Sequence, residues 1–126
     1  MTLAFDLGWI IAIGLVAVGV YAIFAPHPLA HGYGVPAEGH SAAAFVRATG
    51  VRDIAFGVAL GATAYFHFLP LLIVLAVVGI IVSAVDLGVV FHHGRSKRIH
   101  AAHAIHASGI VAFVLILAMA LFAVGR

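Results

Sequence analysis

Residues 70–91 read PLLIVLAVVGIIVSAVDLGVVF, and Asp86 is the only charged side chain in this run. A helix of roughly 20 apolar residues is long enough to cross the hydrocarbon core of a bilayer. Pro70 is compatible with the first turn of such a helix, where the N–H that proline lacks has no partner in any case. The run therefore predicts a membrane-spanning helix.

Three further stretches have the same apolar character, at about residues 7–25, 43–66 and 103–124. The first is expected to end at Pro26, because proline cannot continue a helix. Only three residues separate the second stretch from Pro70, which predicts a tight antiparallel hairpin. We therefore predict an all-α integral membrane protein. A single domain over residues 1–126 would form a compact bundle of four transmembrane helices with short loops.

The composition excludes an ordinary water-soluble domain. Hydrophobic residues make up 65% of the 126 residues and charged residues only 8%, whereas a soluble domain carries about 25% charged residues. The chain has no cysteine, which excludes thiolate ligands, disulfides and thiol catalysis. The formal charge of +2 depends on few residues and does not indicate nucleic-acid binding. The lipid bilayer is the expected environment.

Charge placement predicts an orientation in the membrane. With four spans, the loops at 26–41 and 92–102 lie on one side and both termini on the other. Five basic residues fall on the loop side and one on the terminal side: Arg47, Arg52, Arg95, Lys97 and Arg98 against Arg126. Because cytoplasmic loops are enriched in Lys and Arg, we expect these two loops in the cytoplasm and both termini outside, in a bacterial inner membrane. Tyr33 is expected in the aromatic belt on the cytoplasmic side.

Small residues mark one face of the predicted helix at 43–66. Gly50, Gly57 and Gly61 share this face, and Gly57 and Gly61 form a small-xxx-small pair. Such faces let membrane helices approach closely. The Gly57/Gly61 face therefore predicts close packing, either against another helix of the same chain or in a homo-oligomer.

Ionisable residues converge at one depth near the predicted cytoplasmic side. Asp53 and Asp86 lie within predicted spans, with Arg47, Arg52 and His103 at similar levels. A charge within the membrane is costly unless it is paired, protonated or hydrated, and it usually marks a functional site. We expect Asp53 to face protein and Arg52 to extend toward the headgroups. An Arg–Asp clamp between helices is the structural alternative to a functional site.

Nine histidines stand beside only ten charged residues. Imidazole and carboxylate are ligands for Zn, Fe or Cu, and the candidate metal ligands are His93, His100, His103, His106 and Asp86. A transition-metal or haem site with a redox role is therefore one hypothesis. The alternative is a collar of histidines that meets anionic headgroups at the membrane surface.

Several short segments occur in a recognisable order: Phe24-Ala25-Pro26, Tyr33-Gly34-Val35-Pro36, Arg47-x-x-Gly50-x-Arg52-Asp53 followed by Gly57, then Asp86 and His103. This order resembles a family of small uncharacterised four-span membrane proteins of bacteria and fungi, related distantly to the DoxX-like proteins. The resemblance covers most of the chain and implies a four-helix fold. It implies no activity, and His92, His93, His100 and His106 are not part of the pattern.

Two interpretations of function stay open. In the first, the chain binds or transforms a lipophilic small molecule, with Asp53 or Asp86 as acid or base and His103 orienting the base. Arg47 or Arg52 would hold an oxygen of that molecule. In the second, the chain is a non-catalytic subunit or accessory factor of a larger membrane complex. The sequence does not decide whether the protein is an enzyme.

Overall fold

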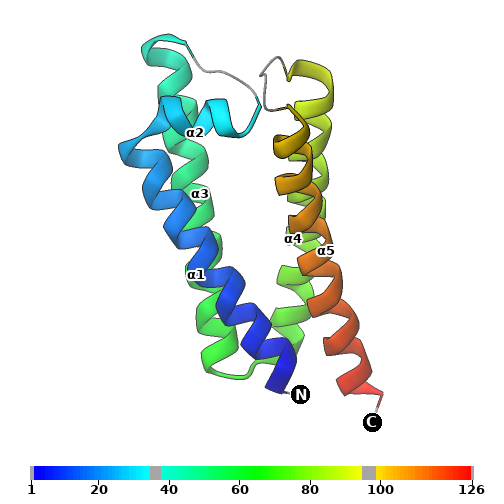
Figure 1. Ribbon diagram of the computed structural model, residues 1–126. Helices are drawn as coiled ribbons and strands as arrows, with labels where there is room; N and C mark the ends of the chain where they lie inside the picture. The colour runs from blue at the N-terminus through cyan, green and yellow to red at the C-terminus, as the bar shows by residue number, and fades with distance from the viewer. Residues whose placement is uncertain (1, 35–37, 95–98, 126) are drawn as a thin grey trace.

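The computed structural model describes residues 2–34, 38–94 and 99–125, and every regular element in these ranges is an α-helix. The helices are α1 (Thr2–Phe24), α2 (Pro26–Gly32), α3 (Gly39–Tyr65), α4 (Leu69–His93) and α5 (Ile99–Val124) (Figure 1). Some residues used in the sequence analysis lie outside the described ranges, namely Val35, Pro36, Arg95, Lys97, Arg98 and Arg126. The structure is therefore all-helical, as the hydropathy predicted.

Within the described part of the chain, three helices are long and apolar enough to cross a bilayer, over Leu3–Phe24, Leu69–His93 and His100–Val124. They fit an integral membrane protein. The helix α3 has a comparable length, but Arg47, Arg52 and Asp53 interrupt its apolar character. The four predicted spans are thus reduced to three by length and composition alone.

The loop predicted at 26–41 contains the short helix α2. The helix α1 ends at Phe24, one residue earlier than expected, and Ala25 leaves the helical conformation (φ −131°, ψ 59°). Pro26 then begins α2, where a proline fits the first turn. The proline therefore ends one helix, as predicted, and also begins another.

The turn between α3 and α4 is closed by a Schellman motif. The N–H of Phe68 donates to the carbonyl of Thr63 at 3.1 Å, and the N–H of His67 donates to that of Ala64 at 3.3 Å. His67 occupies the left-handed position of this motif with φ 52°, where glycine is usual. The ring of His67 meets that of Phe5 edge-on at 4.8 Å. The predicted tight hairpin is present.

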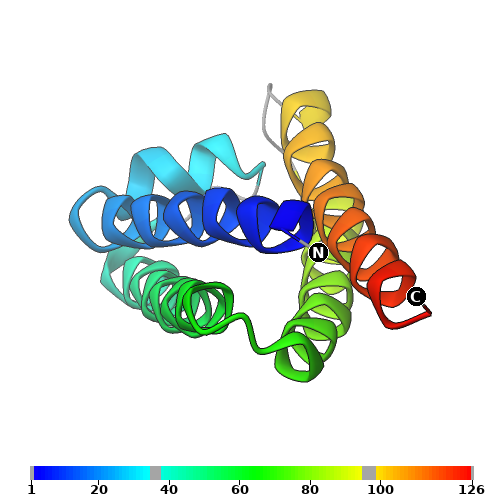
Figure 2. The ribbon, with the colours of Figure 1, turned by 90° about the horizontal axis from the view of Figure 1, so that it is seen from below.

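The long helices form two antiparallel pairs. The helix α1 packs along α3, and α4 packs along α5, whereas α3 and α4 contact each other far less. Figure 2 shows the two pairs side by side, seen along the helices. Both chain ends and the α3–α4 turn lie at one end of the molecule, here called the turn end (Figure 1). The opposite end, which carries α2, is called the α2 end.

Glycines bring α1 and α3 into backbone contact. A Cβ added to Gly50 would lie 2.6 Å from the carbonyl oxygen of Gly19, and one added to Gly57 would lie 2.8 Å from that of Ala12. A Cβ added to Gly61 would lie 3.5 Å from the side chains of Ala12 and Trp9, which is an ordinary contact. The glycine face is therefore covered by α1 of the same chain. The predicted use of the Gly57/Gly61 face in a homo-oligomer is not supported, because that face is already occupied.

Glycines also set the distance between α4 and α5. A Cβ on Gly79 would meet the ring of Phe113 at 2.6 Å, and one on Gly109 would meet the hydroxyl of Ser83 at 2.9 Å. Membrane helices associate through close van der Waals packing, since lipid is as apolar as their side chains. The same device thus stabilises both helix pairs.

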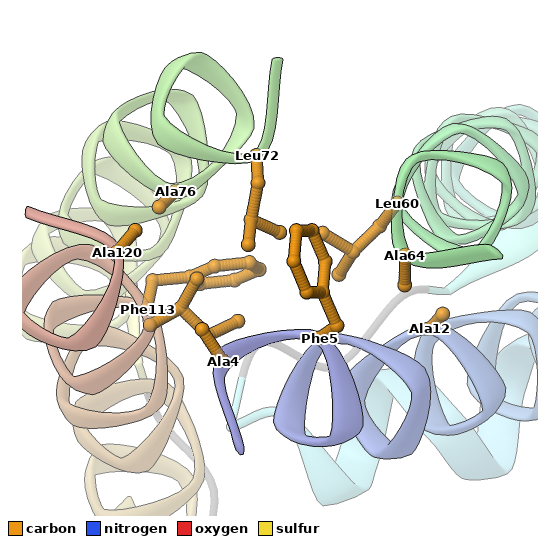
Figure 3. Close-up of a cluster of buried hydrophobic side chains, with 10 residues drawn as sticks. Ala4, Phe5, Ala12, Leu60, Ala64, Leu72, Ala76, Phe113 and Ala120 are labelled. Carbon is orange, nitrogen blue, oxygen red and sulfur yellow. The ribbon is translucent and has the colours of Figure 1, made fainter. Parts of the chain in front are cut away.

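A buried cluster joins the two pairs at the turn end. Phe5 of α1 inserts between α3 and α4, where it meets Leu60 and Leu72 (Figure 3). Phe5, Leu60 and Leu72 are fully buried, and so is Ile116 of α5. The two pairs are therefore fixed together at this end.

Candidate functional site

A cavity of about 630 Å³ lies between the two helix pairs toward the α2 end. Residues of all five helices contribute to its wall, from Leu15 of α1 and Leu29 of α2 to Phe113 of α5. Its wall is mostly apolar and includes Phe45, Val82 and Val89. The volume falls within the ~300–1,000 Å³ that small-molecule sites occupy. The cluster around Phe5 packs the two pairs together at the turn end, and the cavity lies between them on the α2 side of that cluster.

A charged group lies on the wall of this cavity. Arg52 donates from Nε and Nη2 to Oδ1 of Asp53, at 3.1 and 3.0 Å, and from Nη2 to Oδ2 of Asp86, at 3.2 Å. The structure thus brings three of the predicted site residues together. The expectation that Arg52 extends to the headgroups is wrong, because its side chain bridges α3 and α4. The residues of the predicted Arg–Asp clamp are therefore also part of the cavity wall.

The two carboxylates of this group differ in access. Asp53 is buried, at 8% exposure, and faces protein as predicted. The side chain of Asp86 keeps 31% of its surface exposed. Both oxygens named above accept hydrogen bonds from Arg52, and this pairing lowers the cost of placing charges at this depth. Asp86 is therefore the carboxylate more open to a bound molecule.

Tyr33 and His106 complete the polar part of the wall. Tyr33 follows α2, and its ring meets that of His106 edge-on, with centroids 5.2 Å apart. Burial, reinforced by the charges of Asp53 and Asp86 against that of Arg52, raises the pKa of Tyr33 to about 12. Its hydroxyl group stays protonated at neutral pH and is available as a donor. Nε2 of His106 is buried without a hydrogen-bond partner among the described residues.

The position of Tyr33 corrects its assignment to the aromatic belt. The side chain is half-buried and lies on the cavity wall, not among exposed interfacial aromatics. The sequence contained one signal for this placement, since Tyr33 belongs to a segment that carries the family resemblance. Thr49 and Ser83 also line the cavity and were not predicted, because an isolated hydroxyl within an apolar helix has no distinctive spacing.

Two predicted site residues lie away from the cavity wall. Nε of Arg47 donates to the carbonyl of Ile23 at 3.2 Å. That carbonyl belongs to the last turn of α1, where a helix leaves acceptors without internal partners. His103 stacks on Phe91 of α4, with centroids 4.2 Å apart and an angle of 24°. These contacts give both residues structural roles, at the end of α1 and between α4 and α5.

The predicted metal ligands do not come together. In residues 2–34, 38–94 and 99–125, no three His, Asp or Glu side chains lie close enough to hold a metal ion. His100 and His103 are neighbours, with ring centroids 6.5 Å apart, and His93 lies beside His92 at 6.4 Å. His106 and Asp86 instead lie on the cavity wall. This geometry gives the metal or haem hypothesis no support from the described residues.

A comparison with protein families places the chain. The family described as "Domain of unknown function (DUF4267)" matches residues 12–121. The chain belongs to this family. The DUF4267 match spans α2, α3 and α4 whole and most of α1 and α5, so it includes the whole cavity wall. No curated protein and no solved structure matches the chain. The function of this DUF4267 domain must therefore be inferred from its cavity.

Proposed function

We propose that this protein binds a lipophilic small molecule in the cavity between its two helix pairs. The observation that carries the proposal is a cavity of about 630 Å³ whose largely apolar wall carries the compact charged group Arg52–Asp53–Asp86. Binding sites for small molecules combine a large apolar surface with a few polar groups that fix orientation. The apolar part of the molecule would contact Val82 and Phe113, and its polar end would lie near Asp86.

Two features support binding over a purely structural role. Nε2 of His106 faces no protein partner among the described residues, and a buried polar atom usually has one. Asp86 keeps about a third of its side chain accessible although it pairs with Arg52. Of the described imidazoles with a buried, unpartnered Nε2, His106 lies on the cavity wall and His103 does not. If the molecule is also transformed, Asp86 and His106 are the groups placed to move a proton.

The proposal includes a fourth membrane span. The packing of α3 along the apolar α1 supports a position of α3 in the same layer of the bilayer. Its charges Arg52 and Asp53 pair with each other and with Asp86, which lowers the cost of burial in the membrane. With four spans, the positive-inside rule puts the α2 end in the cytoplasm. A distant relation to DoxX-like proteins remains part of this proposal and is carried only by the residue pattern.

A pair of tryptophan substitutions on α4 tests the cavity. Val82→Trp places a large ring on the cavity wall, whereas Val85→Trp places it on a residue that is 59% exposed and does not line the cavity. The protein would be released from its native membrane in mild detergent, and bound molecules identified by native mass spectrometry. We expect an occupant in the wild type and in Val85→Trp, and loss of it in Val82→Trp.

The tryptophan test needs a control for folding, and two results would contradict the proposal. Both variants should accumulate as folded helical protein, measured by circular dichroism. Equal occupancy in Val82→Trp and Val85→Trp would show that the molecule binds elsewhere. A wild-type protein that releases nothing beyond bulk phospholipid, and that takes up no added lipophilic probe, would contradict the proposal.

A further inference from the structure

The cavity wall carries unequal numbers of opposite charges. Its ionisable residues in the described part of the chain are Arg52, Asp53, Asp86, His106 and Tyr33. Tyr33 is uncharged at neutral pH, because burial raises the pKa of its hydroxyl group to about 12. With the imidazole of His106 neutral, two carboxylates face one guanidinium. Among the described residues of the wall, one negative charge is therefore left without a paired positive charge when both carboxylates are ionised.

The other arginine of α3 does not supply the missing charge. Arg47 lies outside the cavity wall, and its Nε donates to the carbonyl of Ile23. Arg52 is shared, since Nη2 contacts both Asp53 and Asp86. An unbalanced charge in an environment of low polarity is costly. A bound cation would reduce this cost, whereas a bound anion would increase it.

Besides the donors Arg52 and Tyr33, the wall carries several groups that can accept a hydrogen bond from a bound cation. Asp86 and the hydroxyl oxygen of Ser83 are acceptors on α4, and Thr49 Oγ1 donates to the carbonyl of Phe45 at 3.1 Å, which leaves its lone pairs for a ligand. A neutral His106 can accept through Nε2, which has no partner among the described residues. An alkylammonium group has three N–H donors and no acceptor, like the side chain of lysine.

We propose that the occupant of the cavity is a lipophilic cation, whose ammonium group lies against Asp86 and whose hydrocarbon part lies along the apolar wall. This inference rests on the proposed function and names the chemical class of its ligand. The apolar wall on the turn-end side of the charged group includes Val82, Phe56 and Phe113. The rings of Phe56 and Phe113 meet edge-on, with centroids 5.7 Å apart.

Three probes with one hydrocarbon chain test the inference without any mutation. Decylammonium, decanol and decanoate each contain ten carbons, and they differ mainly in the charge and hydrogen bonding of the head group. Their binding to the wild-type protein would be measured by calorimetry in nanodiscs of zwitterionic phosphatidylcholine at pH 7, with empty nanodiscs as the blank. We expect decylammonium to bind about tenfold or more tightly than either other probe, since water at the exposed part of Asp86 screens part of the attraction.

Substitutions then assign the preference to Asp86. Asp86→Asn should bring decylammonium close to the affinity of decanol, and Asp6→Asn, at an exposed residue of α1 near the turn end, should leave the preference unchanged. If decanol or decanoate binds the wild type as tightly as decylammonium, the inferred class is wrong while the cavity remains a binding site. If none of the three binds wild type above the Val82→Trp background, both this inference and the proposed function fail.

Discussion

Replacing Gly50 by alanine would put a methyl group into the closest contact between α1 and α3. The added Cβ would lie 2.6 Å from the carbonyl oxygen of Gly19 and 2.6 Å from Cβ of Ala22. An ordinary contact begins near 3.4 Å, so each distance is short by about 0.8 Å, the difference between 3.4 and 2.6 Å. Neither neighbour is the end of a flexible side chain. The helices must therefore move apart.

The change in the free energy of unfolding combines two costs in packing with one gain in helix propensity. Inserting a methylene-sized group into tight packing costs about 1–3 kcal/mol. A radial gap of roughly 0.5–1 Å also removes a quarter to a half of each van der Waals attraction along the seam. Alanine gains up to about 1 kcal/mol over glycine in helix propensity. We therefore expect Gly50→Ala to lower the free energy of unfolding by about 1–2 kcal/mol.

Gly14→Ala is the matched control, because Gly14 lies on the exposed face of α1 with no atom within 4 Å of the added Cβ. It should be neutral or slightly stabilising. Unfolding in mixed micelles with increasing SDS would be followed by the fluorescence of Trp9, the only tryptophan of the chain. Trp9 lies against Gly61 of α3, so its emission reports separation of α1 from α3. If Gly50→Ala is as stable as Gly14→Ala, the close α1–α3 contact is not present.

Two further predictions concern Tyr33 and the membrane topology. The difference in tyrosinate absorbance between wild type and Tyr33→Phe should appear with a midpoint near pH 12, because burial and the aspartates hold the pKa of Tyr33 above its ordinary value of 10. A midpoint near pH 10 would show that the hydroxyl group lies in water. Because the folded state holds this proton more tightly, the same residue should make the fold less stable as pH rises from 10 to 12. Single cysteines at Glu38 and Phe66, introduced into a chain that has none, should react with an impermeant maleimide from opposite sides of the membrane; reaction from one side would contradict the proposal that α3 spans it.

The candidate site was partly accessible to sequence reasoning. Depth could be estimated from position along each apolar run, so Asp53 and Asp86 could be expected at one level. The direction of the Arg52 side chain could not be predicted, because helix geometry fixes only its Cα–Cβ bond. The rest of this long side chain can turn to either side of the helix. The prediction that Arg47 and His103 belong to the site was not met by the cavity wall, for a related reason. Their contacts, with Ile23 and Phe91, depend on which helices are neighbours.

The sequence by itself determined the long helices and indicated a lipid environment, but it did not reveal α2. Hydropathy over 70–91 and the break at Pro26 depend on neighbouring residues alone, and such local signals do not need the rest of the fold. Only the tertiary structure decided that α1 covers the Gly57/Gly61 face and that Tyr33 lies on a cavity. Both depend on the two helix pairs being joined at the turn end through Phe5 and separated toward α2. Pairing of helices in a membrane is set by shape, and the shape of a surface exists only after its side chains are packed.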